Sequence, residues 1–189
     1  AAVLSGECML EFVPKTYIAN SYEYQEKRWF SGKSDLSEYS VNINGEHIPV
    51  SSGSTVFCTS YGHFGIEICE DVWTPIPPSS VPEMQDADII FNLSASNELV
   101  GKNRYRKSLI LQQSARTNCA YVYTSSGVGE STTDMVFSGT ALIAENGVLL
   151  AESVRFSLES ELIIADIDIS EIRHNKLVNT NNLSADSGN

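Results

Sequence analysis

The stretch from Asp88 to Thr124 decides the fold class. It opens with the apolar run Asp88-Ile-Ile-Phe-Asn-Leu93 and closes with Ala120-Tyr-Val-Tyr-Thr124, and both runs are typical of buried strands. Between residues 101 and 119 the chain contains neither glycine nor proline, and small or apolar residues recur at four-residue spacing, which predicts a helix. A strand, a helix and a strand in this order predict a layered α/β fold with helices outside the sheets.

Shorter patterns on either side extend this arrangement. Two hairpins are predicted near the start, one over residues 1–13 and one over 41–50, where Asn44-Gly45 suits a tight turn with positive φ angles. Further strands are predicted by β-branched and aromatic runs at 55–59, 64–68, 140–144 and 162–167. Shorter helical turns are predicted at 22–30 and 82–86. The hairpins indicate mixed strand directions.

The composition is that of one folded domain. The 189 residues are 42% hydrophobic and 19% charged, which excludes a disordered chain, and only residues 178–189 have the polar composition of a tail. A net charge of −12 disfavours nucleic acid as a partner, because such binding rests on Lys and Arg. No apolar run approaches the roughly 20 residues of a membrane helix. We therefore expect a cytoplasmic protein with neither membrane nor nucleic acid as a partner.

The four cysteines follow no metal-binding pattern. They form no C-x-x-C pair and have no histidine at zinc spacing, so we expect no metal site. A chain of this size does not need disulfides, and we expect reduced thiols.

One cysteine stands where a nucleophile belongs. Cys69 lies in Gly65-Ile-Glu-Ile-Cys69-Glu-Asp-Val-Trp73, at the point where an apolar strand ends and polar residues begin. Such a corner exposes a side chain at the edge of a sheet, and the next peptide N–H can point at a developing oxyanion. A cysteine taken alone is more often buried and inert, because a thiol attacks only as the thiolate, which a nearby cation or base stabilises.

Lys15 offers such a cation. It follows Pro14 at the end of an apolar strand, as Cys69 does, so two strand ends can bring an ammonium beside the thiol. The alternative is a solvated lysine that caps a strand. A Cys-His dyad stays open only with His63, which lies in a glycine-flanked loop.

Several motifs in unbroken order resemble one family. They are Val13-Pro-Lys-Thr-Tyr17, Gln25-Glu-Lys-Arg-Trp-Phe30, the run from Gly65 to Ser79, Ser114-Ala-Arg116, and the segments 129–134, 144–147 and 150–153. They resemble the glutaminase domain of glutamine-dependent NAD synthetase, a branch of the nitrilase superfamily of carbon-nitrogen hydrolases. The resemblance implies a nitrilase-like α-β-β-α sandwich over residues 1–177 that hydrolyses glutamine to glutamate and ammonia.

The resemblance also implies catalytic roles. Cys69 matches the nucleophile and Lys15 the lysine of a Cys, Lys and Glu triad. Glu23, eight residues after Lys15, matches a second glutamate that orients the lysine; the alternative is an exposed carboxylate at a helix start.

Three further residues match the glutamine-binding site of the family. Glu70 is expected to meet the α-ammonium group, Trp73 to wall the aliphatic part, and Ser96 to line the same site. A serine in a loop needs no function, which is the alternative for Ser96.

Two parts of the family's enzyme have no counterpart in these residues. The general-base glutamate belongs to an earlier segment, so we expect an N-terminally truncated sandwich that is inactive or weak alone. We expect the ATP-dependent synthetase domain to lie outside these residues, in which no P-loop pattern occurs. The chain itself is expected to hold no cofactor; ATP, Mg and deamido-NAD belong to the parent enzyme, a glutamine-hydrolysing NAD synthase. Expected partners are glutamine, the synthetase domain and further copies of the chain.

Two other functions stay open at this point. One is a free-standing nitrilase-type amidase that acts on another amide. The other is a catalytically incomplete fragment that serves as a binding or structural piece.

Overall fold

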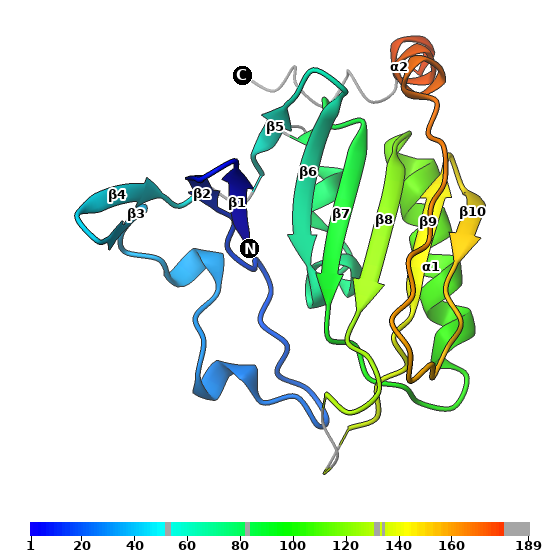
Figure 1. Cartoon of the computed structure of the whole chain (residues 1–189), viewed down its shortest axis with the longest axis horizontal. Coiled ribbons are helices and arrows are strands. Elements are labelled where there is room, and N and C mark those ends of the chain that lie inside the picture. The colour runs from blue at the N-terminus through cyan, green and yellow to red at the C-terminus, as the bar shows by residue number, and fades with distance from the viewer. Residues whose placement is uncertain (52–53, 82–83, 131–132, 134, 180–189) are drawn as a thin grey trace.

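A six-stranded mixed sheet forms the body of the chain (Figure 1). The computed structural model describes residues 1–51, 54–81, 84–130, 133 and 135–179. The spatial order of the strands is β10-β9-β8-β7-β6-β5, with β6, β7 and β8 parallel and the other neighbours antiparallel. The strands are β5 (Val56–Cys58), β6 (His63–Ile68), β7 (Ile89–Ser94), β8 (Ala120–Ser125), β9 (Ala141–Glu145) and β10 (Val148–Glu152).

Helix α1 (Lys102–Thr117) connects the parallel strands β7 and β8 and covers one face of the sheet (Figure 1). It begins after Gly101 and ends at Asn118, and both residues have positive φ angles, of 83° and 47°. Glycine and asparagine adopt this conformation more readily than other residues, which explains the helix ends. The core between helix and sheet includes Ile90, Ile110, Tyr121, Tyr123 and Leu142. The predicted strand-helix-strand unit is confirmed.

A hairpin of β1 (Ala2–Ser5) and β2 (Cys8–Phe12) packs on the β6 side of the molecule. Val3 and Val13 form a second core with Ile66, against which Phe57, Phe64 and Phe91 pack. The second predicted hairpin is also present, as β3 (Ser40–Ile43) and β4 (Glu46–Pro49). Its turn residues Asn44 and Gly45 have φ angles of 53° and 93°, as a tight turn requires.

The last part of the chain differs from the prediction. Residues 162–167, predicted as a strand, pair with no strand, and Leu162 and Ile164 are 82% and 78% exposed. They lead into helix α2 (Ile169–Val178), which the apolar pattern did not predict. Asp168 starts this helix by accepting a hydrogen bond from the peptide N–H of Glu171.

The remaining helical segments are short 3₁₀ turns. Residues 22–30 form only η1 (Glu26–Arg28), while the helix predicted at 82–86 lies partly outside the described residues. The other turns are η2 (Lys33–Asp35), η3 (Cys69–Trp73) and η4 (Pro78–Ser80). In the part of the chain that the structure describes, no helix combines the length and the apolar character that a bilayer-spanning segment needs.

Candidate active site

The candidate nucleophile lies on a strained turn directly after β6. β6 ends at Ile68, and Cys69 opens η3 with a positive φ of 50°. Residues other than glycine rarely adopt this conformation, and it concentrates at functional sites. Cys69 is 8% exposed and is unpaired, as are the other three cysteines. The predicted corner between strand and turn is present.

The carboxylate of Asp71 ties this turn to the segment that carries Lys15. It accepts hydrogen bonds from the peptide N–H groups of Ile68, at 2.8 Å, of Tyr17, at 2.8 Å, and of Thr16, at 3.1 Å. Burial raises the pKa of Asp71 to about 6, although the hydrogen bonds from Tyr17 and Ile68 act in the opposite direction. One buried side chain therefore holds the nucleophile turn and the lysine segment together.

Cys69 and Lys15 line the same cavity, which has a volume of about 470 Å³. The cavity lies at the carboxyl ends of the three parallel strands, where α/β sheets commonly bind ligands. Its other lining residues are Glu26, Ile68, Leu93, Ser94, Ala95, Thr124, Ser125 and Ser126. Two candidates that are 54 positions apart in the sequence thus meet at one site.

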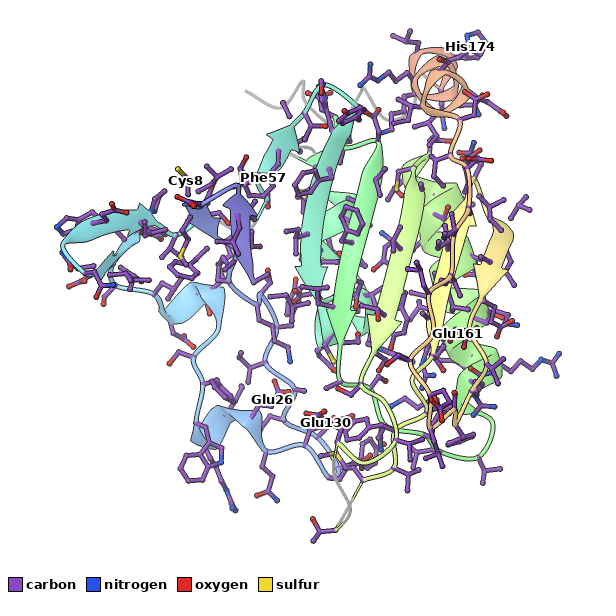
Figure 2. The ribbon with its side chains drawn as sticks, viewed as in Figure 1. Cys8, Glu26, Phe57, Glu130, Glu161 and His174 are labelled. Atoms are coloured by element: carbon purple, nitrogen blue, oxygen red, sulfur yellow. The ribbon has the colours of Figure 1, made fainter. Side chains whose placement is uncertain are left out.

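Glu26 is the ionic partner of Lys15 in this cavity. Figure 2 shows Glu26 on the segment that joins β2 to β3, below the β1–β2 hairpin. The Glu26 carboxylate also accepts a hydrogen bond from the peptide N–H of Ala19 at 3.2 Å. Only 15% of the Lys15 side chain and 26% of the Glu26 side chain are exposed, so solvent screens the pair only in part.

Glu23, which was predicted to orient Lys15, has a different hydrogen-bond partner. Its carboxylate accepts a hydrogen bond from the side-chain amide of Asn97. The reason is a closed loop: the peptide N–H of Glu26 donates to the carbonyl of Ala19 at 3.1 Å, so the chain turns back and places Glu26 over Lys15. The structure therefore corrects the contact predicted for Glu23.

The three residues predicted to bind substrate are not among the residues that line the cavity. Glu70 follows Cys69, and burial raises its pKa while the ammonium of Lys15 opposes the shift. Trp73 ends η3, and its ring lies 5.6 Å from that of Tyr105. The peptide N–H of Ser96 donates to Ser125, a lining residue, at 3.0 Å.

Tyr24 adds a contact that the sequence did not indicate. Its hydroxyl donates to the carbonyl of Ala95 at 3.0 Å and accepts from the peptide N–H of Asn97 at 2.8 Å. Burial raises the pKa of Tyr24 to about 12. This side chain fastens the loop that carries Glu26 to the segment after β7. Tyr24 forms hydrogen bonds with residues more than 70 positions away, so its neighbours in the sequence gave no signal for its role. Glu26 and Asp71 both lie in motifs quoted above, but their partners could not be read from those motifs.

The alternative Cys-His dyad is wrong. His63 begins β6, whereas Cys69 follows its last residue, so the full length of the strand separates them. His63 instead lines a separate cavity of about 730 Å³ near α2. Six extended residues span roughly 20 Å, far beyond hydrogen-bond distance.

Comparisons with known proteins identify the family of the chain. The sequence profile of the carbon-nitrogen hydrolase family matches residues 13–176. The chain is 35% identical over 179 residues to the glutamine-dependent NAD(+) synthetase of Mycobacterium tuberculosis, a match that covers 94% of this chain and 26% of that protein. It is 29% identical over 183 residues to the human glutamine-dependent NAD(+) synthetase, covering 91% of this chain and 26% of that protein.

A solved structure shows the same fold. The glutamine-dependent NAD(+) synthetase of Cytophaga hutchinsonii superposes with a TM-score of 0.71 at 30% sequence identity, over 84% of this chain and 25% of that one. The expected mixed α/β fold of the nitrilase superfamily is thereby confirmed. The chain spans about a quarter of the length of the curated relatives cited above. The profile match and the shared fold show that the chain belongs to the carbon-nitrogen hydrolase family.

Proposed function

We propose that this chain carries the glutaminase site of a glutamine-dependent NAD synthetase. The observation that supports this most directly is the meeting of Cys69 and Lys15 at one cavity, with Asp71 tying their two segments together. A strained cysteine beside a lysine is suited to acyl transfer from an amide, because the ammonium favours both the thiolate and a developing oxyanion. The family membership indicates carbon-nitrogen bond hydrolysis as the reaction class.

The reaction proceeds by covalent catalysis. The Cys69 thiolate attacks the side-chain amide carbon of glutamine, and the Lys15 ammonium and the peptide N–H of Glu70 hold the resulting oxyanion. The carbon-nitrogen bond then breaks, ammonia leaves with an added proton, and a thioester forms. Water attacks the thioester, glutamate is released, and the thiol is restored.

The proton steps need a carboxylate that is free to exchange protons. Glu26 is the one carboxylate among the lining residues within the described ranges, and it is occupied by Lys15 and by the peptide N–H of Ala19. We assign Glu26 to holding Lys15, so the described residues leave the general base unassigned. Turnover by this chain alone should then fall by the roughly 10²–10⁴ that general acid–base catalysis contributes.

The full reaction involves more than these residues. The synthetases that this chain resembles are about four times as long as the chain. We therefore propose that a second, ATP-dependent domain is the partner that consumes the ammonia. There, ATP, Mg and deamido-NAD would be used to form NAD. We further propose a cytoplasmic homo-oligomer, as the resemblance implies.

Alkylation tests the proposed nucleophile. Cys8 and Cys58 are exposed whereas Cys69 is buried, so faster reaction at Cys69 cannot arise from accessibility. With a chloroketone analogue of glutamine, we expect Cys69 to be alkylated first, as shown by peptide mass mapping, and added glutamine to slow this reaction alone. Equal rates at the three cysteines would contradict the proposal. If the chain turns over glutamine rapidly and Cys69→Ala abolishes this turnover, only the claim that these residues lack a general base would be contradicted.

A further inference from the structure

A second cavity lies at the far end of the sheet from the candidate active site. It has a volume of about 730 Å³, a size that suits a small organic molecule. We call it the rear cavity, and its lining includes Ser80, Asp86, Asp88, Arg116, Arg173 and Lys176. Figure 1 shows α2 at the end of the sheet where the parallel strands begin, whereas Cys69 follows the opposite end of β6. A ligand in the rear cavity would therefore not compete with a ligand beside Cys69.

Positive charge gathers around the rear cavity in a chain that is strongly negative. Three of the 12 Lys and Arg side chains line it, against two of the 24 Asp and Glu side chains, although the whole chain has a net charge of −12. One carboxylate is already neutralised, because Arg173 donates to both oxygens of Asp88, at 3.0 and 2.7 Å. This leaves Arg116 and Lys176 against the exposed carboxylate of Asp86, so the rear cavity favours an anion.

The ammonium of Lys176 is partly buried and forms no ion pair within the described residues. It donates instead to two neutral backbone carbonyls, that of Gln85, at 2.8 Å, and that of Ala87. An ammonium has three donors, so one stays available. Burial lowers the pKa of Lys176 more than the nearby carboxylates of Asp88 and Asp86 raise it. An anion bound beside this ammonium would offset the cost of its burial.

Arg116 supplies a second cation, at the end of α1. It belongs to the motif Ser114-Ala-Arg116, which has no part in the candidate active site, and its exposed guanidinium makes no hydrogen bond or ion pair within the described residues. The partial negative charge of a helix end would otherwise disfavour an anion here. It is reduced because the peptide N–H groups of Asn118 and Cys119 donate to the last carbonyls of the helix, and because Arg116 lies in the last turn.

Two further groups of the rear cavity fit the remaining parts of such a ligand. The Ser80 hydroxyl accepts from the side-chain amide of Gln113 at 2.8 Å, so its own proton can be donated. The Asp86 carboxylate makes no hydrogen bond or ion pair within the described residues, and it can accept from hydroxyl groups.

Two cations from different helices, with a hydroxyl donor, match the three oxygens of a phosphate group better than the two of a carboxylate. We propose that the rear cavity binds a phosphate ester of a small hydroxyl-bearing compound. Its phosphate meets Arg116, Lys176 and Ser80, and a hydroxyl group of its body meets Asp86.

Equilibrium dialysis of the full chain with radiolabelled inositol monophosphate tests this site. We expect the ester to be retained, and unlabelled inositol or inorganic phosphate to displace it only at about tenfold higher concentration than the unlabelled ester. Arg116→Gln should weaken retention about tenfold, since it removes a charge-assisted hydrogen bond. Arg104→Gln, which removes another exposed guanidinium of α1, is the matched control and should bind like the unchanged chain. The ester should not protect Cys69 from iodoacetamide.

Each contrary result overturns the proposal. No retention of the ester shows that the rear cavity does not bind it. Equal weakening by Arg104→Gln and Arg116→Gln shows that only the net charge of the chain matters. Displacement by inorganic phosphate or inositol at the concentration of the ester itself excludes recognition of both parts of the ligand. Protection of Cys69 places the ligand in the other cavity. None of these results bears on the proposed glutaminase function.

Discussion

Replacement of Asp71 by asparagine tests the contact that assembles the site. Asp71 is 1% exposed, and its two carboxylate oxygens accept from Ile68 on one side and from Thr16 and Tyr17 on the other. Asparagine has the same shape but only one acceptor oxygen, so its amide nitrogen must face an N–H group. One buried donor is left without an acceptor, which costs about 1–3 kcal/mol. We therefore expect Asp71→Asn to lose about 2 kcal/mol of unfolding free energy at pH 8.

The pH dependence of this loss identifies the buried carboxyl group. The pKa of Asp71 is about 6 in the folded chain and near its ordinary value of 3.8 when unfolded, so the folded state binds the proton more tightly. Proton binding by Asp71 therefore makes its whole contribution to the free energy of unfolding at pH values below the pKa of Asp71 in the unfolded chain. This contribution is lost as the pH rises through about 6, the pKa in the folded chain. Between pH 8 and pH 5 the unchanged chain should gain about 1.4 kcal/mol that the asparagine variant lacks.

Urea unfolding followed by circular dichroism measures both effects. The difference between the unchanged chain and Asp71→Asn should increase from about 2 to about 3.4 kcal/mol as the pH falls from 8 to 5. Asp166→Asn, which replaces an exposed carboxylate, is the control and should shift the stability by less than about 0.5 kcal/mol. A difference that stays constant over this pH range would refute the reasoning, since the titrating group would then not be Asp71.

Three further predictions follow from individual contacts. Glu26→Gln removes the ionic partner of Lys15 and should slow alkylation of Cys69 by the glutamine chloroketone about tenfold. Glu23→Gln should have a smaller effect, because a glutamine oxygen still accepts from Asn97. Equal effects of the two variants would contradict the assignment of Glu26 as the residue that holds Lys15. Arg106→Met removes the fully buried one of the two cations paired with Glu98 and leaves only the more exposed Arg155, so it should cost about 3 kcal/mol in urea unfolding. A loss below about 1 kcal/mol would show that the Arg106–Glu98 pair is not buried in solution. Burial raises the pKa of the Cys119 thiol to about 11, so iodoacetamide at pH 8 should not label this cysteine in the folded chain. Labelling of Cys119 at the rate of an exposed thiol would contradict its burial in the core.

Local patterns predicted the elements whose causes are local. The hairpin turn at Asn44-Gly45 follows from two residues that tolerate positive φ, and α1 follows from a long stretch without glycine or proline. The corner at Cys69 was likewise visible, because an apolar strand ends where acidic residues begin. By contrast, residues 162–167 have a strand-like composition but pair with no strand, since a strand requires a hydrogen-bonding partner that composition cannot reveal.

The sequence by itself determined the α/β class, the two hairpins, the strand-end positions of Cys69 and Lys15, and the resemblance that pointed to a glutaminase. Tertiary structure alone decided which groups touch. It placed Glu26, and not Glu23, on Lys15, because a loop closed by Ala19 reverses the chain. It also placed Asp71 between two segments and placed the Lys102 ammonium on the neutral side chain of Asn97. The contacts of Asp71 with Thr16 and Tyr17 join residues that are 55 and 54 positions apart. The energies of all these contacts depend on burial and distance, which no local pattern encodes.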